Sequence, residues 1–153
     1  MAAPFFSFTS YKFVVVPAGF GNELYSKILK ELRASSEYLK EFVKAGATLL
    51  VSGAFSNRDA YNWLPIRIKY VKGQWRVTIE VAKGHKAAAI VEKEECLCDG
   101  YFTEIGAEGE IILTDREGRA ILVVSEYGVG KIIATTIHEY PSKDFIAYCV
   151  GSD

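Results

Sequence analysis

The feature that most constrains the fold is a short apolar run that leads directly into a glycine-rich turn. Phe13 to Val16 are four consecutive apolar residues, and residues 17–21 read Pro-Ala-Gly-Phe-Gly. A run that is apolar at every position is typical of a strand buried on both faces, as in a parallel sheet. The turn marks the carboxyl end of that strand, which is where ligands bind in open α/β sheets. The sequence therefore predicts an α/β fold with a cleft beside residues 17–21.

Two helices and a second buried strand are predicted next. Residues 22–32 carry apolar side chains at four-residue intervals. A second helix is expected to begin at Ser35 or Ser36 and to stop at Gly46. Thr48 to Val51 then form another buried strand, which ends in a Ser-Gly-Ala turn. This order predicts a βαβ unit, whose crossover should be right-handed.

The second half of the chain predicts an antiparallel or mixed β meander. A hairpin turn is expected at residues 72–74, and Asp99-Gly100 is expected to form a further turn. The predicted strands cover residues 66–71, 75–81, 111–113, 120–126 and 131–137. A final helix over residues 142–150 should be capped by Ser142 and stopped by Gly151. A single domain over residues 1–153 is expected from this length.

Charge and hydropathy exclude several classes of partner. The chain has 18 Lys plus Arg against 19 Asp plus Glu, so no net charge attracts nucleic acid or an anionic membrane. No stretch approaches the roughly 18 apolar residues of a membrane helix, and residues 1–8 lack the basic start of a signal peptide. We therefore expect no nucleic-acid partner and no membrane association.

The rare residue types indicate the compartment and the origin. The three cysteines, Cys96, Cys98 and Cys149, are odd in number and do not have the spacing of a disulfide framework, which fits a reducing cytoplasm. Cys96 and Cys98 share one face of a strand, but with His85 they do not make a metal ligand set, so no metal or cofactor is expected. The chain also has one Gln and one Met, and such depletion is a thermophile tendency.

Four stretches in this order resemble the class I glutamine amidotransferase-like superfamily, including its trehalose-utilisation and biotin-ligase-associated branches. They cover residues 13–19, 39–50, 63–66 and 127–139. The resemblance implies a flavodoxin-like three-layer sandwich. It also implies that the sheet is shortened at its N-terminal end, because about ten residues precede Phe13 where the family has a complete βα unit. An uncovered edge strand invites pairing, so a homodimer is expected.

The resemblance also implies a catalytic site in which key groups are replaced. The family hydrolyses glutamine with a Cys nucleophile, a His base, a Glu two residues later and an oxyanion hole of turn amides. The nucleophile position falls here at Ser52 or Gly53, and His138 matches the base. Tyr140 stands in place of the orienting carboxylate, and Glu139 comes one residue early. A competent glutamine amidotransferase is therefore not expected.

The same turns supply the candidate ligand-binding residues. The amides of residues 18–20 are expected to be exposed beside the cleft, and Arg58 is the candidate anion contact. The expected binding residues are Ala18, Gly19, Phe20, Gly21, Gly53 and Arg58. Each of these residues could instead be an ordinary turn residue or a solvated loop residue. In the same way, Ser52 and His138 could have structural roles only.

Three functions remain open from the sequence. The first is a non-catalytic domain that binds a small molecule or a protein partner at the former catalytic cleft. The second is a hydrolase of altered chemistry that uses Ser52 and His138, with Glu139 as a further candidate. The third is a structural protein that assembles as a homo-oligomer.

Overall fold

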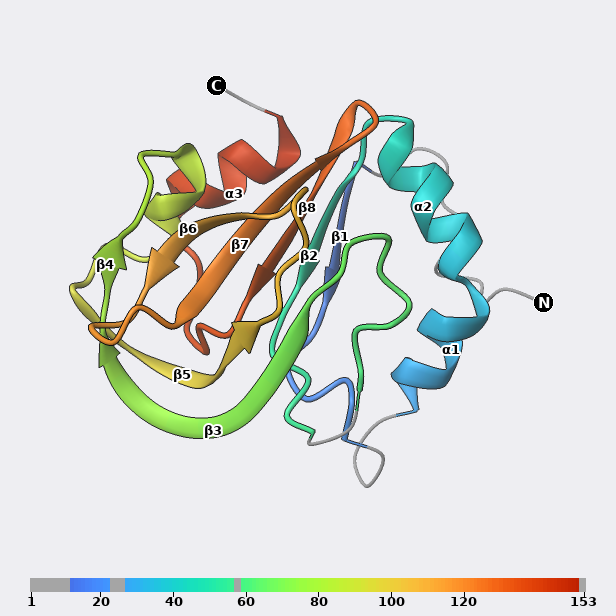
Figure 1. Cartoon of the computed structure of the whole chain (residues 1–153). Helices are drawn as coiled ribbons and strands as arrows, with labels where there is room; N and C mark the ends of the chain where they lie inside the picture. The colour runs from blue at the N-terminus through green and yellow to red at the C-terminus, as the bar shows by residue number, and fades with distance from the viewer. Residues whose placement is uncertain (1–11, 23–26, 57–58, 152–153) are drawn as a thin grey trace.

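The computed structural model describes residues 12–22, 27–56 and 59–151, which form a mixed α/β fold around an eight-stranded sheet (Figure 1). Its strands are β1 (Phe13–Val16), β2 (Thr48–Val51), β3 (Lys69–Thr78), β4 (Glu80–Val81), β5 (Glu95–Thr103), β6 (Glu110–Thr114), β7 (Ala120–Tyr127) and β8 (Gly130–Thr135). Its helices are α1 (Ile28–Ala34), α2 (Ser36–Lys44), the 3₁₀ helix η2 (Lys86–Ile90) and α3 (Lys143–Val150).

The parallel part of the sheet consists of β1, β2 and β8. Strand β2 lies between the other two and pairs with both in parallel. The predicted strand at Thr48–Val51 and the βαβ order are therefore confirmed. Leu49 and Val51 pack in one core cluster with α1 and α2, whereas Leu50 packs in the other with α3. Because side chains alternate along a strand, the two clusters lie on opposite faces of the sheet.

The remaining strands extend the sheet in antiparallel fashion. The order is β1-β2-β8-β7-β5-β3, and β6 pairs with both β7 and β4 outside this path. In Figure 1, β3 curves as a long arc around the lower end of the sheet, while α1 and α2 stand on the opposite side of the molecule from β4. The expected mixed meander is confirmed in this broad form.

The hairpin predicted at residues 72–74 is wrong. These residues lie inside β3, which stays paired with β5 through an irregularity between Lys72 and Trp75. A Cβ atom on Gly73 would lie 1.6 Å from the Trp75 ring, so the glycine leaves room for the indole rather than for a turn.

The turn predicted at Asp99-Gly100 is also wrong, since both residues lie inside β5. A Cβ atom on Gly100 would stand 2.2 Å from the Val71 carbonyl oxygen on the neighbouring strand. The glycine is therefore required by the close approach of two backbones. Asp99 consequently lies within the sheet and not at its rim.

Helix α3 matches its prediction at both ends. The Ser142 hydroxyl accepts a hydrogen bond from the Phe145 amide at 3.1 Å, and Gly151 ends the helix with a left-handed φ of 81°. Phe145 and Cys149 are buried against η2 and the sheet. None of the helices in the described ranges is long and apolar enough to cross a membrane.

Candidate functional site

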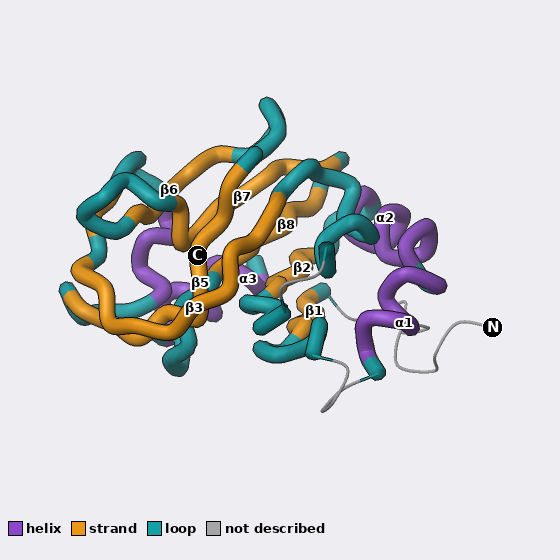
Figure 2. Tube along the Cα trace, turned by 60° about the horizontal axis from the view of Figure 1, so that its bottom comes forward, coloured by secondary structure: helices purple, strands orange, loops and turns teal. Residues whose placement is uncertain are grey.

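A cleft lies where the three parallel strands end. Ala18 follows β1, Ser52 follows β2 and His138 follows β8, and these three line one cavity of about 580 Å³. Ala18 and His138 also line an adjoining cavity of about 320 Å³, together with Gly19, Phe55, Gln74, Leu97 and Asp99. Figure 2, which brings the lower end of the sheet forward, shows the loops after β1 and β2 side by side. We call these two joined cavities the cleft.

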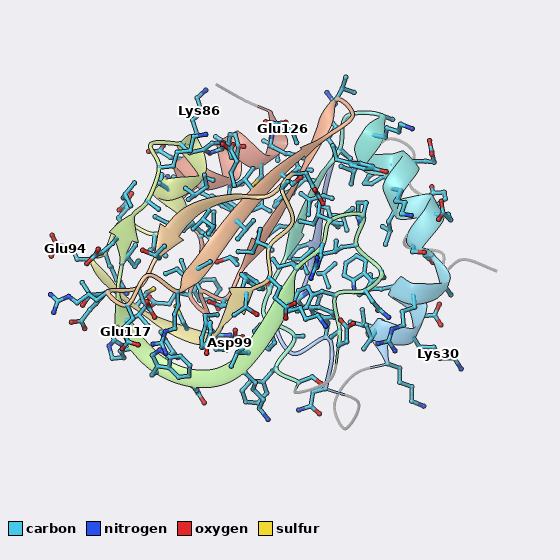
Figure 3. All side chains as sticks on the ribbon, in the orientation of Figure 1. Lys30, Lys86, Glu94, Asp99, Glu117 and Glu126 are labelled. Atoms are coloured by element: carbon cyan, nitrogen blue, oxygen red, sulfur yellow. The ribbon has the colours of Figure 1, made fainter. Side chains whose placement is uncertain are left out.

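The cleft contains a buried carboxylate that comes from the antiparallel part of the sheet. Asp99 on β5 is only 6 % exposed. Figure 3 labels it within the outline of the sheet, whereas Lys30, Lys86 and Glu94 extend from the outer edge of the molecule. The Tyr70 hydroxyl donates to the Asp99 carbonyl oxygen and, at 3.3 Å, to Oδ1. Burial raises the pKa of Asp99 to about 6, although His138 and Tyr70 both lower it.

The Asp99 carboxylate occupies the space that a side chain at position 53 would need. A Cβ atom on Gly53 would lie 1.9 Å from Asp99 Oδ1 and 2.5 Å from Oδ2. Position 53 is one of the two to which the resemblance assigns the nucleophile. Glycine is therefore the residue that lets the carboxylate from β5 enter this end of β2.

His138 faces this carboxylate from the end of β8. Its Nδ1 lies 3.9 Å from Asp99 Oδ2, and its side chain is 55 % exposed. The His138 amide donates to the Leu97 carbonyl at 2.8 Å, which fixes the backbone of the loop against β5. Within the described residues, the Ser52 hydroxyl forms no hydrogen bond to His138, although both line the larger cavity.

Glu139 is held away from the imidazole by other partners. One carboxylate oxygen accepts a hydrogen bond from the Leu97 amide at 2.8 Å, and the other pairs with Lys93 Nζ at 2.9 Å. The Lys93 ammonium and the Leu97 amide hold the pKa of the Glu139 carboxyl below its usual range. The carboxylate that faces His138 is therefore Asp99, which comes from a different strand.

Two tyrosine hydroxyls fix the turn after β2. Tyr61 donates to the Ser52 carbonyl at 2.8 Å and accepts from the Ala54 amide at 2.9 Å. Tyr70 accepts from the Phe55 amide at 3.3 Å. Burial raises the pKa of both hydroxyls well above the ordinary value, so both stay protonated near neutral pH.

The turn after β1 uses its amides within the protein. Gly19 donates to the Gly53 carbonyl at 2.8 Å, and Gly21 donates to the Ala54 carbonyl at 3.0 Å. The Phe20 side chain is fully buried and meets Tyr61 edge-to-face. These two glycine amides therefore join the turns instead of facing a ligand. Arg58, the expected anion contact, lies outside the described residues.

The cysteines lie in the core rather than along the cleft. Cys96 and Cys98 are both buried on β5 with their sulfur atoms 3.8 Å apart, and Cys149 is buried on α3. His85 accepts a hydrogen bond from the Ala87 amide at 3.0 Å and so caps η2. In the part of the chain that the structure describes, no three His, Cys, Asp or Glu side chains gather as a metal site.

Neither a comparison with models of protein families nor one with curated proteins finds a match for this sequence. Solved structures share its fold. A cytoplasmic protein from Salmonella typhimurium is 16% identical with a TM-score of 0.59, over 94% of this chain and 72% of that one. A Thermoplasma acidophilum protein named after GMP synthase is 11% identical with a TM-score of 0.57, over 93% and 72%. A β-galactosidase from Rahnella sp. R3 is 14% identical with a TM-score of 0.55, over 90% of this chain and 21% of that one. At these identities the likeness defines the fold alone, a mixed α/β domain.

Proposed function

We propose that this chain is a glutamine amidotransferase-like domain of the flavodoxin-like sandwich type that binds a small molecule at its cleft and does not hydrolyse glutamine. The observation that carries the proposal is the Asp99 carboxylate in the space of a residue-53 side chain. A thiol at that position would collide with the carboxylate. The chain's own three thiols are buried in the core.

Three further observations support the proposal, the first for the type of domain and the other two for the binding role. The likeness to the protein named after GMP synthase agrees with the amidotransferase-like order of the sequence motifs. Ligands bind beyond the carboxyl ends of strands in open α/β sheets, and the cleft lies at such an edge. A buried carboxylate with a raised pKa in a cavity is costly to keep, which is typical of functional sites.

A hydrolase that uses Ser52 and His138 is the second candidate. Its supporting observation is that Ser52, His138 and Asp99 come from three different segments around one cleft, the set of residue types found in Ser-His-Asp enzymes. The missing hydrogen bond between Ser52 and His138 argues for the binding role instead.

The cellular setting that we propose is the cytoplasm of a thermophile, with assembly as a homodimer. Strand β1 lies at the edge of the sheet, and within the described residues it pairs only with β2. Val15 on this strand is 50 % exposed, so the edge offers apolar surface to a second copy.

The binding role predicts that small molecules perturb one of the two histidines. His138 lies in the cleft, whereas His85 packs against Tyr148 in the α3 region and serves as an internal control. In proton NMR spectra of the imidazole signals, a library of small polar compounds should include members that shift His138 in a saturable manner and leave His85 unchanged. Intact signals that no compound moves would overturn the binding role.

A further inference from the structure

We propose that the ligand of the cleft carries a protonated nitrogen, a primary ammonium or an amidinium, with the Asp99 carboxylate as its counter-ion. This inference rests on the proposed binding function and adds the chemical class of the ligand to it. The reasons are the few donors to Asp99 among the described residues, the aromatic wall beside it and the repulsion that its negative charge would exert on an anion.

Among the described residues, the Asp99 carboxylate has few donors, namely the Tyr70 hydroxyl and its own backbone amide. An ionised carboxyl offers about four lone-pair sites for hydrogen bonds. Tyr70 reaches Oδ1 at 3.3 Å, and His138 Nδ1 remains 3.9 Å from Oδ2, beyond hydrogen-bond distance. A buried anion in this condition is costly, and a cationic donor from a ligand would relieve that cost.

The ion pairs of lysine and arginine within the described residues involve other acids. Among the described residues, the acidic partners in the ion pairs of Lys and Arg do not include Asp99, whose neighbouring cation is His138 when that imidazole is protonated. Within the part of the chain that the structure describes, Asp99 thus has no Lys or Arg counter-ion, and a cationic ligand would supply one.

Phe55 provides a wall that accepts a cation. It lines the smaller cavity, and Lys72 Nζ already stands 4.5 Å from the centre of its ring. Phe55 has a left-handed φ of 53°, which is unfavourable for a bulky side chain. The Tyr70 hydroxyl accepts a hydrogen bond from the Phe55 amide and donates one to the Asp99 carboxylate. The same tyrosine therefore positions the aromatic ring of Phe55 and contacts Asp99.

Two amides of the turn after β1 cannot serve an anionic ligand. The amides of Gly19 and Gly21 donate to carbonyls of the turn after β2, and Asp99 itself would repel a second negative charge. The cavity of about 320 Å³ is at the small end of the range for ligand pockets, so the ligand is small.

The test uses three probes of one shape and different charge: benzylammonium, benzyl alcohol and benzoate. Each is titrated into the full chain, and the His138 imidazole signal reports binding while His85 serves as the control. Benzylammonium should bind with a dissociation constant about tenfold or more below those of the other two, as for a charge-assisted hydrogen bond.

Two variants assign the preference to named groups. Asp99→Asn should remove the preference for benzylammonium over benzyl alcohol. Lys72→Gln, which removes the competing cation over Phe55, should tighten benzylammonium binding several-fold. The preference itself is measured on the unaltered chain, so it stands even if Asp99→Asn does not fold.

The outcomes separate the two proposals. If benzoate or benzyl alcohol shifts His138 as strongly as benzylammonium does, the ligand class is wrong but the binding function stands. The same conclusion follows if Asp99→Asn folds and keeps the preference. If none of the three probes shifts His138, the ligand class is overturned, and the binding function falls if the wider library also fails.

Discussion

Gly53→Ala is expected to destabilise the fold by about 3 kcal/mol, because one added methyl group would collide with a buried carboxylate. The new Cβ would lie 1.9 Å from Asp99 Oδ1. Gly53 is not among the described glycines with a left-handed φ, so alanine brings no backbone strain of its own at this position. The measurement is the free energy of unfolding from urea titration.

A matched glycine and a double-mutant cycle make this prediction specific. Gly84→Ala is the control, since a Cβ there would meet nothing within 4 Å and its φ is also not left-handed. Its effect should stay within about 1 kcal/mol. Combining Gly53→Ala with Asp99→Ala should restore most of the lost stability, which gives a coupling energy of about 2 kcal/mol. Equal effects of the two glycine substitutions, or an additive cycle, would show that the carboxylate does not occupy this space.

Asp99→Asn is expected to stabilise the protein above pH 6 by about 2 kcal/mol. The pKa of Asp99 is raised from 3.8 to about 6 because the buried charge is poorly solvated. A raised pKa means that the folded protein holds this proton more tightly than the unfolded chain does. The wild-type chain therefore loses stability as the pH rises from about 4 to about 6, and the loss is complete above that window. By linkage, a pKa raised by about two units corresponds to a loss of about 3 kcal/mol of stability above pH 6. Asn should recover about 2 kcal/mol of this loss, because its amide does not reproduce all hydrogen bonds of the carboxyl group.

The test compares wild type and Asp99→Asn by urea unfolding at several pH values. The two should be equally stable within about 1 kcal/mol near pH 4 and should diverge as the pH rises. Asp144→Asn, which changes an exposed acid in the first turn of α3, is the control for the loss of a carboxylate. It should show no such gain, because an acid at a helix start is favourable when ionised. A wild-type stability that rises between pH 4 and pH 6 relative to Asp99→Asn would contradict the raised pKa.

The positions of two parallel strands and the ends of helix α3 could be predicted from the sequence because each has a local cause. Thr48–Val51 has neighbours on both faces of the sheet and is buried throughout. Phe13–Val16 forms the strand that the sequence predicts, but the expectation that it is buried on both faces is wrong, because β1 is an edge strand of the described sheet and Val15 is 50 % exposed. Helix α3 has its cap and its stop within the same short segment, at Ser142 and Gly151. Signals of this kind depend on neighbours along the chain and not on the tertiary structure.

The errors arise where packing contacts override a turn-like composition. Residues 72–74 and Asp99-Gly100 both resemble turns, but Gly73 leaves room for the Trp75 ring within β3, and Gly100 allows the close approach of the β3 and β5 backbones. For this reason the position of Asp99 within a strand could not be predicted. A single acid between Cys98 and Gly100 favours a turn over a strand, since an isolated Asp in a strand is rare.

The candidate site could be predicted only in part. Ala18, Ser52 and His138 follow strand ends, and the structure brings all three to one cleft. Asp99 reaches the same place from an antiparallel strand. Its relation to Gly53 depends on sheet order, which no spacing in the sequence reveals.

The most direct test of the central claim is ammonia release from glutamine, measured for wild type and His138→Ala at elevated temperature. We predict no release above the uncatalysed rate from either chain, because neither Ser52 nor Gly53 is a cysteine, the Asp99 carboxylate occupies the space of a side chain at position 53, and the thiols are buried. Release by the wild-type chain that His138→Ala abolishes would contradict this account. It would mean that Ser52 or another group performs the chemistry of the missing cysteine.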